Sequence, residues 1–264
     1  MIYNHRQLKQ YRQMRLIGLG NFVDVYEGEN KRKHKVLIKQ LHSRLSQDDR
    51  NAFLAEGRTV IKLDHPHLLK ANLLAEDHRP PYLVLDYSTH SLFHQRHPVG
   101  DVLPPALIGR YIRQIADAIA YMHRQGLIHQ HLRPENLLLS ENGEILLADL
   151  GIMALIRQTG SQEIYQPVNA ALYMAPELFL GVSKPASDQY SLAAIAYEWL
   201  TGRPLLQGTP DEIFRQCFTI PPSSQLRDSK QIPSTLKQVL LKALARNPED
   251  RFEEITAFTT ALDI

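Results

Sequence analysis

The chain has 264 residues, of which 44% are hydrophobic and 22% are charged, and its formal net charge is +2. This length is enough for one large domain or for two joined lobes that are stable without cross-links. The small net charge argues against a nucleic-acid or membrane surface, so we expect neither as a partner. The single cysteine, Cys217, excludes an internal disulfide and fits a reducing compartment, and we therefore expect a cytoplasmic location.

Strand signals dominate residues 15–86, with one helix among them. The runs "RLIGLG", "VDVYEGE" and "VLIKQL" alternate apolar and polar residues and are joined by polar turns, as in hairpins. Residues 46–63 instead have a helical period, with Ser46 as the expected N-cap and two acidic residues in the first turn. The runs at 65–77 and 81–87 predict two further strands.

The second part of the chain is mainly helical. Residues 103–126 predict a long amphipathic helix that stops at Gly126, and "SLAAIAYEWL" at 191–200 predicts a buried core helix because it is too short to span a bilayer. The Pro- and Ser-rich segment 219–236 predicts an ordinary loop. The expected class is α+β, with one domain over 1–264 that divides into a sheet-rich lobe at 1–87 and a helical lobe at 88–264.

Several short motifs have a chemical interpretation beside an ordinary one. Gly18 and Gly20 lie in a turn between two strands, where glycine lets backbone N–H groups approach phosphates, although two glycines also suit a plain hairpin. Lys39 in "VLIK" needs a partner if it is buried, and Glu56 on the following helix is a suitable one. The alternative is a solvent-facing lysine on an edge strand.

The run "IHQHLRPENLLLS" at 128–140 is followed by "ADLG", which brings Asn136 and Asp149 to the ends of two short strands. Amide and carboxylate oxygens are ligands that suit Mg²⁺ carried by a nucleotide. Asn136 alone is weak evidence, because asparagine is common in turns.

Taken in order, these motifs resemble the protein kinase family and, within it, the bacterial serine/threonine type. The resemblance covers roughly residues 11–262 and includes "APE" with Glu177 and "NPEDRF" with Arg251. It implies the two-lobed protein-kinase fold, an ion pair between Glu177 and Arg251, and an Asp188 carboxylate that accepts backbone N–H bonds from the loop around His129.

The resemblance also implies roles for site residues. ATP would be held by Gly18, Gly20, Val25, Leu37, Lys39, Asp86, Ser88 and Leu138, Mg²⁺ by Asn136 and Asp149, and the catalytic positions would be Lys39, Glu56, His131 and Arg133. Both cofactors are therefore possible.

The catalytic loop departs from the family pattern HRDLKPEN. Gln130 replaces the arginine that would hold a phosphate, and His131 replaces the aspartate that accepts the substrate proton, with Arg133 in place of lysine. General-base assistance is worth about 10² to 10⁴ in rate. Ala170 stands where the family has the threonine that joins the catalytic aspartate and lysine.

The nucleotide side is mixed. Val23 replaces the third glycine of the loop and should crowd the phosphates. Leu37 takes the place of a family alanine that lies against adenine, on the strand face that it shares with Lys39. Leu37 then either fills part of the adenine site or rotates aside and leaves room for ATP.

Three hypotheses follow. The first is a pseudokinase that binds ATP weakly or not at all and works by binding another protein, such as an active kinase or signalling partner. The second is a divergent serine/threonine kinase that transfers the ATP γ-phosphate at a low rate. The third is a structural domain of a longer membrane-linked receptor kinase. No membrane segment is expected within the chain itself.

Overall fold

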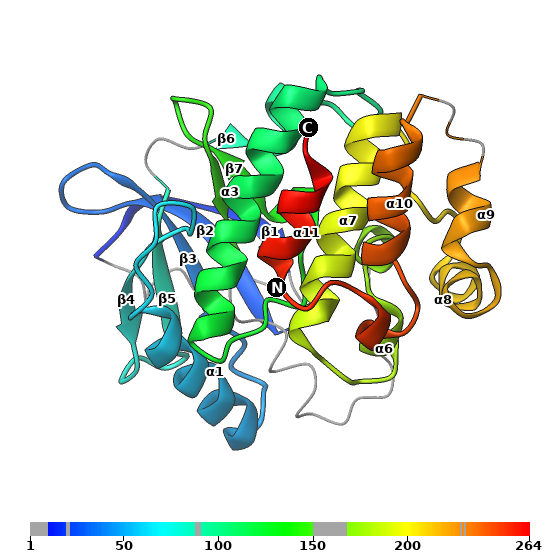
Figure 1. Cartoon of the computed structure of the whole chain (residues 1–264). Helices are drawn as coiled ribbons and strands as arrows, with labels where there is room; N and C mark the ends of the chain where they lie inside the picture. The colour runs from blue at the N-terminus through cyan, green and yellow to red at the C-terminus, as the bar shows by residue number, and fades with distance from the viewer. Residues whose placement is uncertain (1–9, 20–21, 88–90, 150–167, 228, 230) are drawn as a thin grey trace. The chain divides into compact units, whose positions relative to one another are not determined.

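A computed structural model describes residues 10–19, 22–87, 91–149, 168–227, 229 and 231–264. The chain forms two compact units (Figure 1). The first contains the chain up to His90 and also Asp149, and the second contains Ser91–Ala148 and the chain from Glu163 onward. Because Asp149 joins the first unit, that unit is not one continuous stretch of chain.

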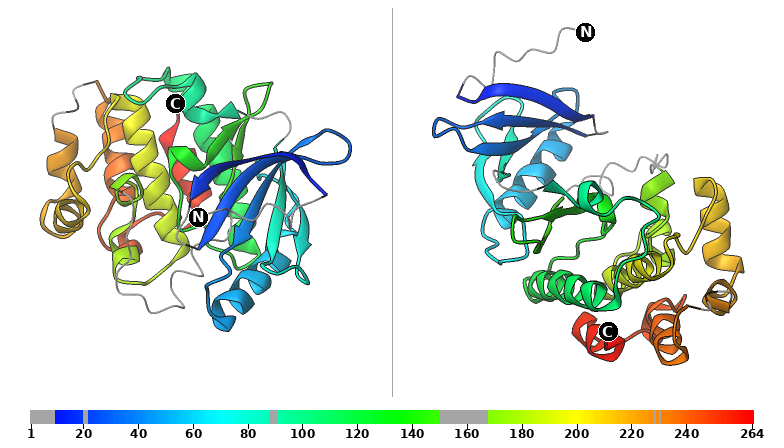
Figure 2. Two further views of the ribbon diagram at one scale, coloured as in Figure 1. Left: turned by 180° about the vertical axis from the view of Figure 1, so that it is seen from behind. Right: turned by 90° about the horizontal axis from the view of Figure 1, so that it is seen from above.

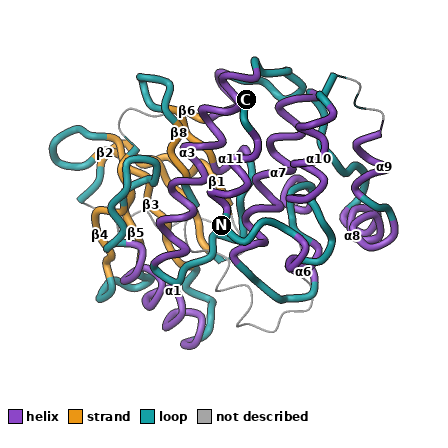
Figure 3. The backbone as a smooth tube through the Cα atoms, viewed as in Figure 1, coloured by secondary structure: helices purple, strands orange, loops and turns teal. Residues whose placement is uncertain are grey.

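The first unit contains an antiparallel sheet with the strand order β1-β2-β3-β5-β4. Figure 3 shows the strands in orange. The predicted strands are confirmed: β1 (Arg12–Leu19), β2 (Val23–Glu29), β3 (Lys35–Leu41), β4 (Ala71–Ala75) and β5 (Tyr82–Asp86). Opposite residues of paired strands share a face of a sheet. Since Val25 lies opposite Lys39, these two side chains lie on one face.

The other face carries a buried apolar cluster of Tyr26, Val36, Ile38, Tyr82 and Val84. Partly buried residues near the start of the unit, such as Tyr11 and Met14, pack against it. Alternation along β3 therefore separates its two sets of side chains: one set belongs to this core, and the set with Lys39 belongs to the opposite face.

The helix α1 (Gln47–Val60) starts as the sequence predicts. Ser46 Oγ accepts a hydrogen bond from Asp49 N at 3.1 Å, and Asp49 Oδ2 accepts one from Ser46 N at 3.0 Å. This reciprocal capping box satisfies two backbone donors. A Cβ added at Gly57 would lie 2.7 Å from Leu74 Cδ1, so glycine lets α1 pack closely on β4. Leu74 lies opposite Leu83, which lies opposite Lys39, and α1 therefore covers the Lys39 face.

The second unit is mostly helical, with a small sheet of β6 (Ser91–Leu92), β7 (Leu137–Leu139) and β8 (Ile145–Leu147). Its described residues form α2 (Phe93–Arg96), α3 (Pro105–Arg124), η2 (Pro134–Asn136), α5 (Val168–Ala171), α6 (Pro176–Phe179), α7 (Pro185–Thr201), α8 (Pro210–Thr219), α9 (Pro222–Arg227), α10 (Ser234–Ala243), η3 (Pro248–Asp250) and α11 (Ile255–Leu262).

The helix α7 forms the core of the second unit, as predicted for "SLAAIAYEWL". Its residues from Ser187 to Leu200 are all buried, and α3, α10 and α11 pack against it (Figure 2). The long helix α3 ends where expected, with Gly126 at a φ of 73°. In the described part of the chain no helix has the length and apolar character that crossing a membrane requires.

The α+β class is confirmed, but one local prediction was wrong. Segment 219–236 contains α9 rather than only a loop. Pro222 suits the first position of a helix, and Leu226 is buried, so packing stabilises a helix that the Pro- and Ser-rich composition concealed.

Candidate active site

Lys39 lies in the middle of β3 and is only 7% exposed. A buried ammonium group needs a compensating charge. Its Nζ donates to Oδ1 of Asp149, with which it forms an ion pair. In the described part of the chain, Lys39 is thus paired with Asp149 and not with Glu56, which the sequence suggested as its partner.

Glu56 is half-buried on α1 near this ion pair, and its Oε2 atom is buried. Its Oε2 has no hydrogen-bond partner in the described part of the chain. Burial raises the pKa of Glu56 to about 8, the charge of Lys39 opposes this shift, and the charge of Asp149 adds to it. The raised pKa favours the protonated carboxyl group at neutral pH, in keeping with the pairing of Lys39 with Asp149 instead.

The backbone of Asp149 has a φ of 66°, in the left-handed region. For a residue other than glycine this conformation costs about 1–2 kcal/mol. The ion pair between its side chain and Lys39 offsets this cost. Such strained positions gather at functional sites, which marks Asp149 as a site candidate on geometry as well as on sequence.

Gly18 lies in β1 opposite Val25 of β2. A Cβ added at Gly18 would lie 3.6 Å from Val25 Cβ, an ordinary contact, so packing of the sheet does not require glycine there. A site that must admit a phosphate next to the backbone would explain the glycine. Gly20 and Ser88, two other predicted nucleotide-binding residues, lie outside the described residues.

Two bulky side chains share the sheet face of Lys39. Val23 lies opposite Leu41 and is buried, and Leu37 is only 8% exposed. Leu37 also lies opposite Leu85, which is fully buried. Both side chains are thus packed within the protein, as expected if they take up space that the family reserves for a nucleotide. Asp86 is the last residue of β5, an interior strand of the same sheet.

In the second unit, Asp188 fixes the loop that begins at His129. The buried Asp188 carboxylate accepts hydrogen bonds from His129 N at 2.9 Å and from Gln130 N at 2.7 Å, as predicted. His123 Nε2 also lies 2.8 Å from Asp188 Oδ2. The sequence alone did not indicate this role of His123, because a histidine in a helix gives no sign of a contact with a carboxylate 65 positions away.

His131 occupies the position at which the family has its catalytic carboxylate, and Asn136 contacts it twice. Asn136 Nδ2 donates to His131 O at 2.8 Å and lies 3.3 Å from His131 Nδ1. Because an amide nitrogen only donates, Nδ1 is the acceptor, and the proton of the neutral imidazole then lies on Nε2. In this arrangement neither ring nitrogen offers a lone pair to a substrate.

Two neighbours of His131 carry buried polar atoms without partners in the described part of the chain. Gln130, at a φ of 65°, donates from Nε2 to Ile128 O at 3.3 Å, while its Oε1 is unsatisfied, as is Arg133 Nε. The neutral amide of Gln130 cannot form the charged fork of an arginine. Leu138, the remaining predicted nucleotide-binding residue, is buried in β7.

The buried ion pair that the family resemblance implies is present in the second unit. Arg251 donates from Nη1 to Glu177 Oε1 at 2.7 Å and from Nη2 to Oε2 at 2.9 Å, so the predicted ion pair is confirmed as a bidentate one. Ser187 Oγ donates to Glu177 Oε1 at 2.7 Å. Ala170, in α5, is buried and brings no hydroxyl group to the site.

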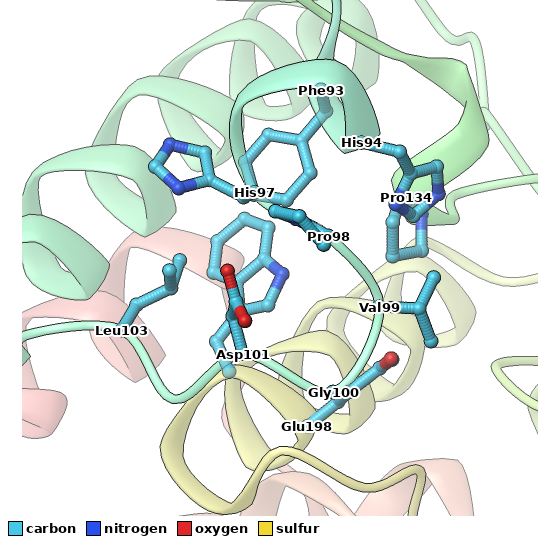
Figure 4. Close-up of a pocket in the computed structure, with 11 residues that line it drawn as sticks. Phe93, His94, His97, Pro98, Val99, Gly100, Asp101, Leu103, Pro134 and Glu198 are labelled. Carbon is cyan, nitrogen blue, oxygen red and sulfur yellow. The ribbon is translucent and has the colours of Figure 1, made fainter.

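A small pocket in the second unit lies beneath α2 (Figure 4). The stacked rings of Phe93 and Trp199 line it, together with His94, Asp101 and Glu198. It encloses about 10 Å³, which is room for about one water-sized group. Burial raises the pKa of the Glu198 carboxyl group. The pocket contains none of the predicted site residues and is too small for a nucleotide.

Asp149 and Asn136 each carry an oxygen atom of the kind that Mg²⁺ prefers as a ligand. Asp149 has a carboxylate, and Asn136 uses its nitrogen for His131, which leaves the amide oxygen as a possible ligand. No group of three or more His, Cys, Asp or Glu residues within the described ranges could hold a metal by itself. Asp149 belongs to the first unit and Asn136 to the second, and either side chain alone would need further ligands, such as nucleotide phosphates, to hold Mg²⁺.

Comparisons with known proteins agree with this arrangement. The sequence profile of the protein kinase domain family matches residues 11–261. Serine/threonine-protein kinase PknD of Mycobacterium tuberculosis is 32% identical over 257 residues, which are 93% of the chain and 38% of that protein. PknL of the same organism is 29% identical over 258 residues, which are 94% of the chain and 63% of PknL.

A third relative is serine/threonine-protein kinase PknB of Mycolicibacterium smegmatis, which is 29% identical over 250 residues, 90% of the chain and 40% of that protein. The chain thus spans between 38% and 63% of the length of these three relatives. Its sheet with one helix, followed by a mainly helical unit, is the kinase fold.

Proposed function

The chain belongs to the protein kinase family, and on that premise we propose that it is a catalytically impaired member, a pseudokinase, which acts by binding another protein. In this proposal it binds ATP and Mg²⁺ weakly or not at all. The proposal includes a cytoplasmic location, in keeping with the free, buried thiol of Cys217.

One observation carries the proposal. Asp188 holds the loop from His129 in place, yet the side chain presented at position 131 is an imidazole whose Nδ1 is in contact with Asn136. In kinases the carboxylate at this position accepts the proton of the substrate hydroxyl group and orients it. An imidazole with a proton on Nε2 and an occupied Nδ1 does neither.

The nucleotide-binding residues support the second half of the proposal. The pair between Lys39 and Asp149 engages the cation that would contact phosphates and the carboxylate that would hold the metal. Leu37 is already packed among protein atoms on the same sheet face. ATP would have to displace that ion pair and share the space of Leu37.

An exposed apolar surface supports protein binding. Leu180 and Val182, just after α6, are 63% and 47% exposed, and Phe214 on α8 is 41% exposed. The ring of Phe214 meets that of Phe179 edge-on at 5.6 Å, which joins the two helices into one patch. Grouped apolar side chains at a surface are typical of interaction sites.

The second candidate is a divergent serine/threonine kinase that transfers the ATP γ-phosphate slowly. Lys39, Asn136 and Asp149 are retained, and Gly18 is not needed for packing, which favours this candidate. The two candidates differ in two observables: the turnover of the native chain and its affinity for the nucleotide.

A thermal-shift titration with ATP and Mg²⁺ tests the nucleotide part. A ligand that binds only the folded state stabilises it by RT ln(1 + [L]/Kd), so we expect no saturable rise in melting temperature up to about 1 mM ATP. In the Leu37→Ala variant, which opens the sheet face, the rise should become measurable. A saturable rise in the native chain with submillimolar affinity would contradict the blocked-site proposal.

A further inference from the structure

The turn between β2 and β3 is the most basic short stretch of the chain. Residues 31–35 are Lys31, Arg32, Lys33, His34 and Lys35, which we call the basic turn, and all five are exposed. The turn projects beyond the end of its own sheet, at the left of Figure 1 and at the right of the left-hand view in Figure 2. Its side chains are therefore available to a partner.

Hydrogen bonds hold the backbone of the basic turn in one conformation. Asn30 Oδ1 accepts from Arg32 N at 2.9 Å and from His34 N at 3.1 Å. Asn30 N also donates to His34 O at 3.0 Å, and Lys33 N donates to Asn30 O at 2.9 Å. The cationic side chains thus extend from an ordered ribbon, which lowers the entropy cost of binding.

The fold does not explain these charges. Lys35 Nζ lies 3.3 Å from Glu27 Oε1, but Glu27 also pairs with Arg15 at 2.5 Å. Within the described residues, Lys31, Arg32 and Lys33 form no ion pair at all. Adjacent like charges repel each other, so the basic turn costs some stability and leaves a positive potential uncompensated.

The charge of the rest of the chain narrows the choice of partner. Four of the chain's 30 Lys and Arg residues lie in the basic turn, so the other 26 are outnumbered by 28 Asp and Glu residues. A membrane or a nucleic-acid duplex would attract the turn and repel much of the remainder. The basic turn itself also carries no apolar side chain that could enter a bilayer.

A short anionic segment of a protein, unlike a membrane or a duplex, can contact the turn without also approaching the acidic remainder of the chain. We propose that the basic turn is a docking site for an acidic segment, rich in Asp and Glu, of a partner protein. This inference rests on the proposed function in one respect, namely that the domain works by binding another protein. Complementary charges of this kind raise the association rate and select the partner.

Fluorescence anisotropy with a short, fluorescein-labelled, Glu-rich peptide tests the proposal. The native chain should bind the peptide saturably, and the triple variant Lys31→Gln, Arg32→Gln, Lys33→Gln should bind about tenfold more weakly. Raising the salt concentration should weaken binding by the native chain, because the sites are exposed.

The matched control neutralises three exposed basic residues elsewhere, by Lys62→Gln, Arg124→Gln and Arg227→Gln. It should bind the peptide as the native chain does, and both triple variants should be folded, with melting temperatures no lower than that of the native chain. Equal affinity of the two triple variants would overturn the proposal. Tighter binding of the native chain to phosphatidylserine vesicles or to a DNA duplex than to the peptide would also overturn it. The titration uses no nucleotide, so its outcome is independent of whether the chain transfers phosphate.

Discussion

Two buried polar networks of this molecule differ in how completely their groups are satisfied. The Arg251 guanidinium in the second unit donates to both oxygens of Glu177 and to backbone carbonyls such as Ala245 O. In the first unit, Glu56 Oε2 is buried without a partner in the part of the chain that the structure describes, beside the pair of Lys39 and Asp149.

The two networks therefore have different consequences for stability. A network in which every buried polar group has a hydrogen-bond partner stabilises the fold. Removing one member leaves a buried charge without its partner. A network with an unsatisfied carboxyl oxygen contributes less to stability, because no hydrogen bond offsets the desolvation of that oxygen. Three measurements of stability test this difference.

The largest effect is expected from Arg251→Ala. The substitution leaves the Glu177 carboxylate buried without its cation, which should lower the free energy of unfolding by about 3–5 kcal/mol. Urea denaturation measures this directly. The control is Lys184→Ala, which removes an ion pair with Glu249 whose side chains are 42% and 71% exposed. Exposed pairs contribute about 0–1 kcal/mol, so equal losses in the two variants would contradict the distinction.

The next effect is a pH dependence that depends on Glu56. Its pKa in the folded state, about 8, is above the usual value of 4.5, so the folded state binds the proton more tightly than the unfolded state does. Stability from this group is complete below pH 4.5 and is lost as the pH rises towards 8. Glu56→Gln removes the titrating group.

Relative to Glu56→Gln, the native chain should therefore lose roughly 2–4 kcal/mol between about pH 4.5 and 8. Urea denaturation of both proteins across this range measures the difference. Glu141→Gln, at an exposed position, is the control, and its curve should run parallel to that of the native chain. A native curve parallel to that of Glu56→Gln would show that Glu56 titrates normally.

A smaller effect is expected from Asp188→Asn. The amide is similar in size, but each carboxylate oxygen of Asp188 accepts from a backbone N–H group, so the N–H₂ group of the asparagine must face one of these donors. We expect a loss of about 1–3 kcal/mol in the free energy of unfolding. Hydrogen exchange at the amides of His129 and Gln130 should speed up as well. Unchanged exchange there would mean that the loop is held by other contacts.

Sequence patterns anticipated most of the fold and the scaffold. The Ser46 cap and the strands follow local rules, and the pairing of Glu177 with Arg251 follows from the family resemblance. The partner of Lys39 did not follow, because the choice between Glu56 and Asp149 depends on how deeply each carboxyl group is buried. The role of His123, the left-handed backbone of Asp149 and the helix α9 likewise depend on tertiary packing.

Phosphate transfer by the native chain is the most direct test of the central claim, that the fold is retained without the reaction. The assay uses radiolabelled ATP with Mg²⁺ and compares the native chain, Lys39→Ala and His131→Asp, each confirmed as folded by its melting curve. We expect the native chain to be indistinguishable from Lys39→Ala. His131→Asp, which restores the carboxylate alone, should gain at most about 10² over that background. Robust turnover by the native chain that disappears in Lys39→Ala would contradict the account.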